Sequence, residues 1–139
     1  MSPFSKKVIM KLIVFITIIF FSTNAFSQNK LNGKKIFETR CLVCHQADGG
    51  GVPRMSPPLF DTDFTTGDKK RLITILLKGL NESIEVQDET YFSPMASFSY
   101  LTDKEIAAIL TYVRTNFGNK ASSIVDVEVA TIRKALGKK

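Results

Sequence analysis

Apolar residues recur at helical spacing in four stretches of the chain, and polar residues or glycines bound each of them. These stretches are 31–40, 68–78, 102–117 and 126–136. Asn32 stands where an N-cap is expected for the first helix, and Gly79 ends the second. In the third and strongest, Thr102 and Glu105 have the spacing of a capping box. The pattern therefore predicts helices in all four stretches.

The segments between these helices show turn signals and little strand character. Residues 47–58 hold three glycines and three prolines, which is typical of a loop. Residues 83–92 alternate weakly between apolar and polar side chains and are compatible with a small hairpin. There is no internal repeat. We therefore expect an all-α protein of three to five helices with almost no sheet.

A further apolar segment lies near the amino terminus. Three lysines occur among the first 11 residues, residues 12–21 are apolar apart from Thr17, and Ala25-Phe26-Ser27 matches a small-x-small cleavage pattern. This order is typical of a secretory signal peptide, so residues 1–27 are predicted to be one. An uncleaved membrane anchor is the alternative, although a span needs about 20 apolar residues. The rest is expected to form one domain, 28–118, and a C-terminal extension, 119–139, with a short helix.

The charge of the chain gives no support to nucleic-acid binding. There are 19 basic and 13 acidic residues, a formal net charge of +6. Three of the lysines fall in the predicted signal, and Arg133, Lys134, Lys138 and Lys139 lie in the last seven residues. No basic stripe interleaved with aromatic residues runs along the domain. We therefore expect no nucleic-acid partner.

The chemistry of the chain is concentrated in one short motif. The only two cysteines and the only histidine are Cys41, Cys44 and His45. On a helical turn, positions i, i+3 and i+4 share a face. Two thiols at i and i+3 can each add to a vinyl group of one haem, and the imidazole at i+4 then lies under the iron. The spacing predicts one covalently attached haem c, with its iron bound by His45.

Three other interpretations of the Cys41–His45 motif have less support from the sequence. A redox-active Cys-x-x-Cys pair belongs at a strand-to-helix junction, and no strand is predicted before Cys41. A structural zinc ion needs four ligands, but the chain has no second cysteine pair and no second histidine. A disulfide between positions three apart closes too small a loop to stabilise the fold much.

From about Leu31 to Asn119 the sequence also resembles class I cytochrome c, and within it the small cytochrome domains of periplasmic dehydrogenases and reductases. The resemblance rests on Cys41–His45, on Gly33 and Phe37 at eight and four residues before Cys41, and on a late methionine. It implies the cytochrome c fold, with the helix of Gly33 and Phe37 crossing the helix of Tyr112. A glycine inside a helix costs about 1 kcal/mol, and close helix approach would explain it.

The resemblance also implies the remaining haem contacts. Met95, in the segment Ser93–Phe98, matches the family's ligand loop and is expected to be the second axial ligand of the iron. Met55, only ten residues past His45, is the other methionine of the mature chain and a much poorer match. A proline carbonyl shortly before a leucine supports the axial histidine in the family, and here these are Pro57 and Leu59. Phe98 is expected beside the haem.

Together these expectations describe an electron carrier and not an enzyme. With His45 and Met95 both on the iron, no coordination position is left for a substrate. We expect a periplasmic protein with redox protein partners, such as a dehydrogenase, a reductase or a terminal oxidase, and membrane association only through an uncleaved signal or a partner complex. If Met95 leaves the sixth position open, the alternative is a haem sensor or a weak peroxidase.

Overall fold

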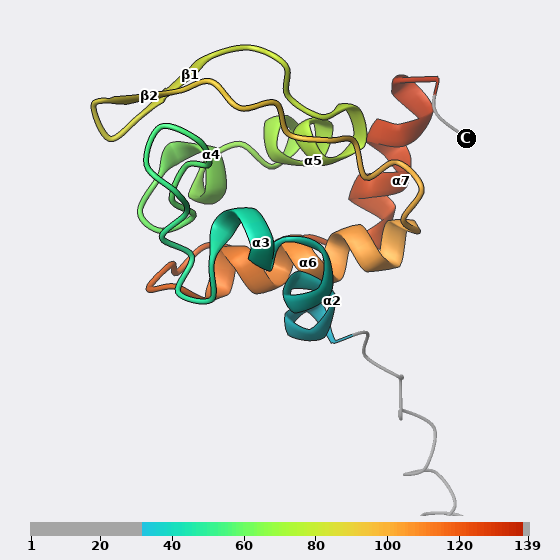
Figure 1. Cartoon of the computed structure of the whole chain (residues 1–139). Helices are drawn as coiled ribbons and strands as arrows, with labels where there is room; N and C mark the ends of the chain where they lie inside the picture. The colour runs from blue at the N-terminus through green and yellow to red at the C-terminus, as the bar shows by residue number, and fades with distance from the viewer. Residues whose placement is uncertain (1–31, 138–139) are drawn as a thin grey trace, which may run out of the picture. The chain divides into compact units, whose positions relative to one another are not determined.

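The computed structural model describes residues 32–137, and these residues are mainly helical (Figure 1). Four helices have two or more turns: α2 (Gly33–Arg40), α5 (Lys69–Lys78), α6 (Asp103–Thr115) and α7 (Asp126–Ala135). Two are single turns, α3 (Leu42–His45) and α4 (Asp63–Thr66), and the only sheet in residues 32–137 pairs β1 (Ile84–Val86) with β2 (Glu89–Tyr91). The expected all-α class is confirmed. The two single turns bring the number of helices among these residues to six, above the expected three to five. The predicted signal peptide lies outside the described residues.

Two of the four long helices, α2 and α6, begin at the caps that the sequence predicts, and α5 begins at a further side-chain cap, Asp68. The Asn32 side chain accepts a hydrogen bond from the Lys35 amide at 3.2 Å, and the Asp68 carboxylate accepts from the first turn of α5. Thr102 and Glu105 form the predicted capping box, with the Thr102 amide donating to Glu105 at 2.8 Å. Such caps satisfy backbone N–H groups that have no partner within the helix. They explain why the predicted boundaries agree with the observed ones to within one or two residues.

Helix α2 crosses α6 (Figure 1). Gly33 allows the two helices to come close together. A Cβ atom on Gly33 would lie only 2.1 Å from the carbonyl oxygen of Ala108. Phe37, one turn further along α2, packs against Tyr112 and Phe117 with ring centroids 5.5 and 5.3 Å apart. The glycine therefore has the role that the resemblance implied, since it lets the two backbones meet.

The C-terminal helix α7 packs against both α5 and α6. Val129 of α7 is fully buried in the same core as Ile73 and Ile106. An ion pair of 3.0 Å joins Lys69 at the start of α5 to Glu128 of α7. Helix α7 is thus part of the folded core and covers one side of it. Within residues 32–137, no helix is long and apolar enough to cross a membrane.

The segment between β2 and α6 runs across α5, as Figure 1 shows. Leu80 and Met95 form an isolated antiparallel bridge with two backbone hydrogen bonds, of 2.9 and 2.8 Å. The Phe98 amide donates to the Leu76 carbonyl at 2.8 Å. These contacts fix the course of residues 95–98 along α5, and they close one wall of the interior.

Candidate functional site

An apolar cavity lies at the centre of residues 32–137, with about 750 Å³ of empty space including its open mouth. Its lining comes from α2, α3, α4, α5, β1 and α6 and from the loops between them. His45 and Thr65 are the only lining side chains that carry a nitrogen or oxygen atom. A cavity lined almost wholly by apolar side chains suits a mainly apolar ligand with few polar contacts.

His45 lies in the cavity wall at the end of α3, and it is only 9% exposed. Its Nδ1 is 3.1 Å from the carbonyl oxygen of Pro57. Because a carbonyl can only accept, Nδ1 must carry the proton, and Nε2 is then the nitrogen with a free lone pair. Burial lowers the pKa of the imidazole, and the Pro57 hydrogen bond only partly opposes this. The side chain is therefore a neutral, oriented nitrogen ligand at pH 7.

The glycine-rich loop positions the carbonyl that orients His45. The Gly51 amide donates to the His45 carbonyl at 3.1 Å, and the Leu59 amide donates to Gly49 at 2.8 Å. Gly51 has a φ of 70°, and a Cβ atom there would lie 2.7 Å from the Pro57 oxygen. Only glycine fits this position, since both the backbone angle and the space exclude a side chain. The loop thus forms part of the support of the histidine.

The two cysteines occupy different positions relative to the cavity. Cys41 lines it, whereas Cys44 is exposed and is not among the lining residues. Burial, with a smaller contribution from Cys44, raises the pKa of the Cys41 thiol to about 11. A redox-active pair depends on a lowered thiol pKa. The surroundings of Cys41 therefore disfavour the thioredoxin-like alternative.

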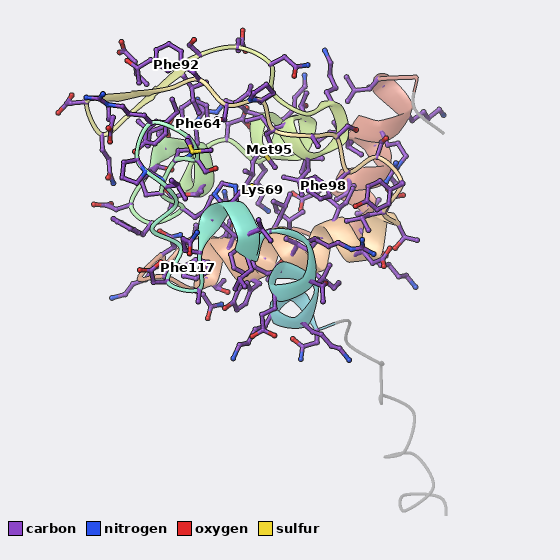
Figure 2. The ribbon with its side chains drawn as sticks, viewed as in Figure 1. Phe64, Lys69, Phe92, Met95, Phe98 and Phe117 are labelled. Atoms are coloured by element: carbon purple, nitrogen blue, oxygen red, sulfur yellow. The ribbon has the colours of Figure 1, made fainter. Side chains whose placement is uncertain are left out.

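Met95 lines the same cavity, and backbone contacts on α5 hold its segment (Figure 2). Gly79, which ends α5, makes this approach possible, because a Cβ atom there would lie 2.5 Å from the Met95 carbonyl oxygen. Phe98 lines the cavity as well, and the Ser97 hydroxyl donates to the Leu77 carbonyl at 2.8 Å. Met55 is 56% exposed and is not a lining residue.

The predicted site residues thus come together with one exception. Cys41, His45, Pro57, Leu59, Met95 and Phe98 all line the cavity, and Cys44 lies next to it on α3. A neutral imidazole and a thioether in one apolar cavity, beside two thiols spaced for vinyl addition, are the donor set that a covalently attached haem requires. The residues present therefore fit haem c. Among residues 32–137 there is no cluster of three or more His, Cys, Asp or Glu side chains that could hold a metal ion by themselves.

Several parts of the site carry no local sequence signal. Phe64 and Thr65 of α4 line the cavity, and buried Arg114 of α6 holds α4 in place by donating to the Thr65 carbonyl at 2.7 Å. Asn119 donates to the Leu59 carbonyl at 2.7 Å and so ties the histidine-supporting loop to the end of α6. These contacts join residues about 50 to 60 positions apart, which periodicity and spacing cannot reveal.

Comparison with known proteins agrees with the geometry. The sequence model of the cytochrome c family matches residues 31–117. Cytochrome c-552 of Thermus thermophilus is 39% identical over 92 residues, which cover 63% of this chain and 70% of that protein. The fructose dehydrogenase cytochrome subunit of Gluconobacter japonicus is 29% identical over 115 residues, 80% of this chain and 24% of the subunit.

A similar relation holds for the cytochrome c subunit of the quinone alcohol dehydrogenase of Gluconacetobacter polyoxogenes. It is 31% identical over 99 residues, which cover 67% of this chain and 20% of that subunit. This chain therefore spans only about a fifth to a quarter of the two dehydrogenase subunits. The family match covers well over half of the chain and includes the cavity-lining residues from Phe37 to Val113. The chain belongs to the cytochrome c family, and its cofactor is covalently bound haem c with its iron.

Proposed function

We propose that this protein is an exported monohaem cytochrome that carries single electrons between redox partners and has no catalytic activity of its own. Cys41 and Cys44 would hold the haem through thioether bonds, and His45 and Met95 would be the axial ligands of its iron. When bound, the haem supplies an iron atom that can gain and lose one electron. Residues 28–118 would form the cytochrome domain, and residues 119–139 an extension that supports it.

The observation that carries this proposal is that His45 and Met95 line one apolar cavity, each held by backbone contacts. Pro57 orients the imidazole, and Leu80 fixes the backbone of Met95. An axial thioether stabilises ferrous iron and suits electron transfer. With both axial positions filled by side chains, neither a gas nor a peroxide has a place to bind. This argues for a carrier over the sensor or peroxidase alternative.

The axial ligand can be tested with a matched pair of methionine variants. In Met95→Ala the weak red-region charge-transfer band of sulfur ligation should be lost from the ferric protein, and in Met55→Ala it should persist. The reduction potential of Met95→Ala should fall by more than about 59 mV, a tenfold change in a one-electron equilibrium. A band that persists in Met95→Ala would contradict Met95 as the ligand. A band absent from the wild type as well would instead favour an open sixth position, and with it the sensor or peroxidase function.

Covalent attachment has a test of its own. Acid–acetone extraction of the unfolded protein should leave the colour with the polypeptide, because thioether bonds survive denaturation. Replacing both Cys41 and Cys44 by serine should release the haem into the solvent layer under the same treatment. Colour in the solvent layer of the wild type would contradict the proposed roles of the two cysteines.

The proposed partners follow from the names of two relatives, and the proposed location follows from residues 1–27. Two relatives bear the names of dehydrogenase cytochrome subunits, so we infer a redox protein as partner for this chain: a dehydrogenase, a reductase or a terminal oxidase. Export to the periplasm rests on the basic, apolar and small-residue order of residues 1–27. The intact mass of periplasmic material should correspond to a chain that starts near Gln28. A mass that includes residues 1–26 would show that the segment is retained.

A further inference from the structure

One side chain of α7, that of Arg133, reaches the segment that joins the methionine loop (residues 93–98) to α6. The guanidinium group of Arg133 donates to the Ser99 carbonyl at 2.6 Å and to the Leu101 carbonyl at 2.7 Å. Its Nε also donates to the Asp103 carboxylate at 2.7 Å. The Arg133 side chain is only 12% exposed. Three short bonds from one nearly buried cation fix the backbone of residues 99–101 and the first residue of α6.

This segment is continuous with Met95 through a short series of local contacts. The Ser97 hydroxyl donates to Leu77 on α5 and accepts from the Ser99 amide at 3.2 Å. The Leu101 amide donates to the Phe98 carbonyl at 3.0 Å. Met95 is therefore held by Leu80 just after α5, residues 97–98 are held by α5, and residues 99–101 are held by α7. No other side chain from α7 has a hydrogen bond to residues 95–101 in the part of the chain that the structure describes.

We propose that Arg133 is a positioning residue for Met95, so that the C-terminal helix sets how readily the methionine leaves the iron. The proposal rests on Met95 being the sixth ligand, as proposed above. We expect the sulfur to withdraw together with the backbone of residues 95–101, because local hydrogen bonds couple Ser97 to Ser99 and Phe98 to Leu101. That movement breaks the charge-assisted bonds of Arg133, which are stronger than bonds between neutral groups.

Imidazole in solution measures this opening directly. It binds the sixth position only in molecules whose methionine has left, so its apparent affinity scales with the population of the open state. Removing the Arg133 bonds should raise that population without altering His45 or the cysteines. A variant whose methionine loop opens more often should therefore bind imidazole more tightly. A loss of packing far from this loop should not change the imidazole affinity.

The holoprotein offers a matched control, because α7 has a second cationic tether. Lys69 pairs with Glu128 at the other end of α7 and has no hydrogen bond to the methionine loop. Ferric wild type, Arg133→Gln and Lys69→Gln are titrated with imidazole, with loss of the red charge-transfer band as the signal and urea unfolding measured in parallel. Arg133→Gln should bind imidazole at least tenfold more tightly than wild type, and Lys69→Gln within twofold of it.

Two further variants keep the test decisive. Arg133→Lys retains the charge but cannot make all three bonds, so its affinity should fall between those of wild type and Arg133→Gln, even if the glutamine variant folds poorly. Asp103→Asn weakens one hydrogen bond of Arg133 and leaves the two bonds to backbone carbonyls. It should therefore raise the imidazole affinity less than Arg133→Gln does. Equal imidazole affinities for Arg133→Gln and Lys69→Gln would overturn the positioning role of Arg133 and leave the ligation by Met95 untouched. A wild type without the band, with the same imidazole affinity as Met95→Ala, would overturn the ligation itself and the role of Arg133 with it.

Discussion

Replacement of Gly79 by alanine is the sharpest test of how the fold places Met95. Gly79 ends α5 with φ 77° and ψ −179°, a backbone conformation that is essentially restricted to glycine. An added Cβ would lie 2.5 Å from the Met95 carbonyl oxygen and 3.0 Å from the Ser97 amide nitrogen. Both neighbours are backbone atoms, so no side-chain rotation can relieve the overlap. The methionine segment must move away from α5.

The expected cost has two parts. Holding a residue with a Cβ in this region of φ and ψ costs about 1–3 kcal/mol. Moving the Met95 backbone weakens its two hydrogen bonds with Leu80, each with a net contribution of about 1 kcal/mol. With both hydrogen bonds lost, the sum is about 3–5 kcal/mol, against a typical domain stability of about 5–15 kcal/mol. The variant should therefore fold, with a loosened methionine segment.

The assay combines urea unfolding with the red charge-transfer band of the ferric protein. Gly118→Ala is the matched control, because Gly118 also has a positive φ, 83°, while a Cβ atom there meets nothing within 4 Å. The control should lose about 1–2 kcal/mol from backbone strain and keep the band. Gly79→Ala should lose more stability and part or all of the band. An intact band in Gly79→Ala, with a stability loss equal to that of the control, would refute this reasoning.

Three further changes test other contacts of the fold. Gly33→Ala should lower the free energy of unfolding by about 1–3 kcal/mol, because its Cβ would lie 2.1 Å from the Ala108 oxygen, and thermal unfolding measures this. Asn119→Ala should lower the free energy of unfolding, measured with urea, by about 3 kcal/mol, because it leaves buried backbone groups without hydrogen-bond partners. Lys120→Ala, a control at an exposed position, should change this free energy little. Hydrogen bonds from Thr102 lower the pKa of Glu105 below its ordinary value of 4.5. The ionised carboxylate therefore contributes fully to folding stability above pH 4.5, and this contribution is lost as the pH falls through the lowered pKa. The stability difference between wild type and Glu105→Gln should therefore shrink on acidification, and a pH-independent difference would contradict the assignment.

The elements that could be predicted are those encoded by neighbouring residues. The capping box of Thr102 and Glu105, the cap at Asn32 and the glycine at the end of α5 all act within one helical turn. The weak alternation in residues 83–92 was compatible with a small hairpin, and β1 and β2 pair there. Helix α4 was not predicted, because four residues are too few for a helical period to show.

The site divides in the same way. The motif from Cys41 to His45 is local, and its spacing alone indicates the chemistry. The exposure of Met55 and the position of Met95 in the cavity wall depend on the tertiary fold, so the sequence could separate them only by resemblance. Arg114, Asn119 and Arg133 were uninformative in the sequence, where an arginine or asparagine is usually exposed. Their buried hydrogen bonds to backbone carbonyls exist only after helices distant in the chain have met.

Long-range contacts support both sides of the cavity. Asn119 donates to the Leu59 carbonyl 60 residues away, beside the Pro57 carbonyl that orients His45. Met95 is held by Leu80, and Arg133 holds Ser99, 34 residues before it in the chain. The two sides differ in another way: the proposed thioether bonds of Cys41 and Cys44 would tie the histidine side to the haem covalently, whereas Met95 would be held by non-covalent contacts, so we expect the methionine side to open first. Under rising urea the charge-transfer band should therefore disappear before the helical signal does, and a single shared transition would mean that both sides open together.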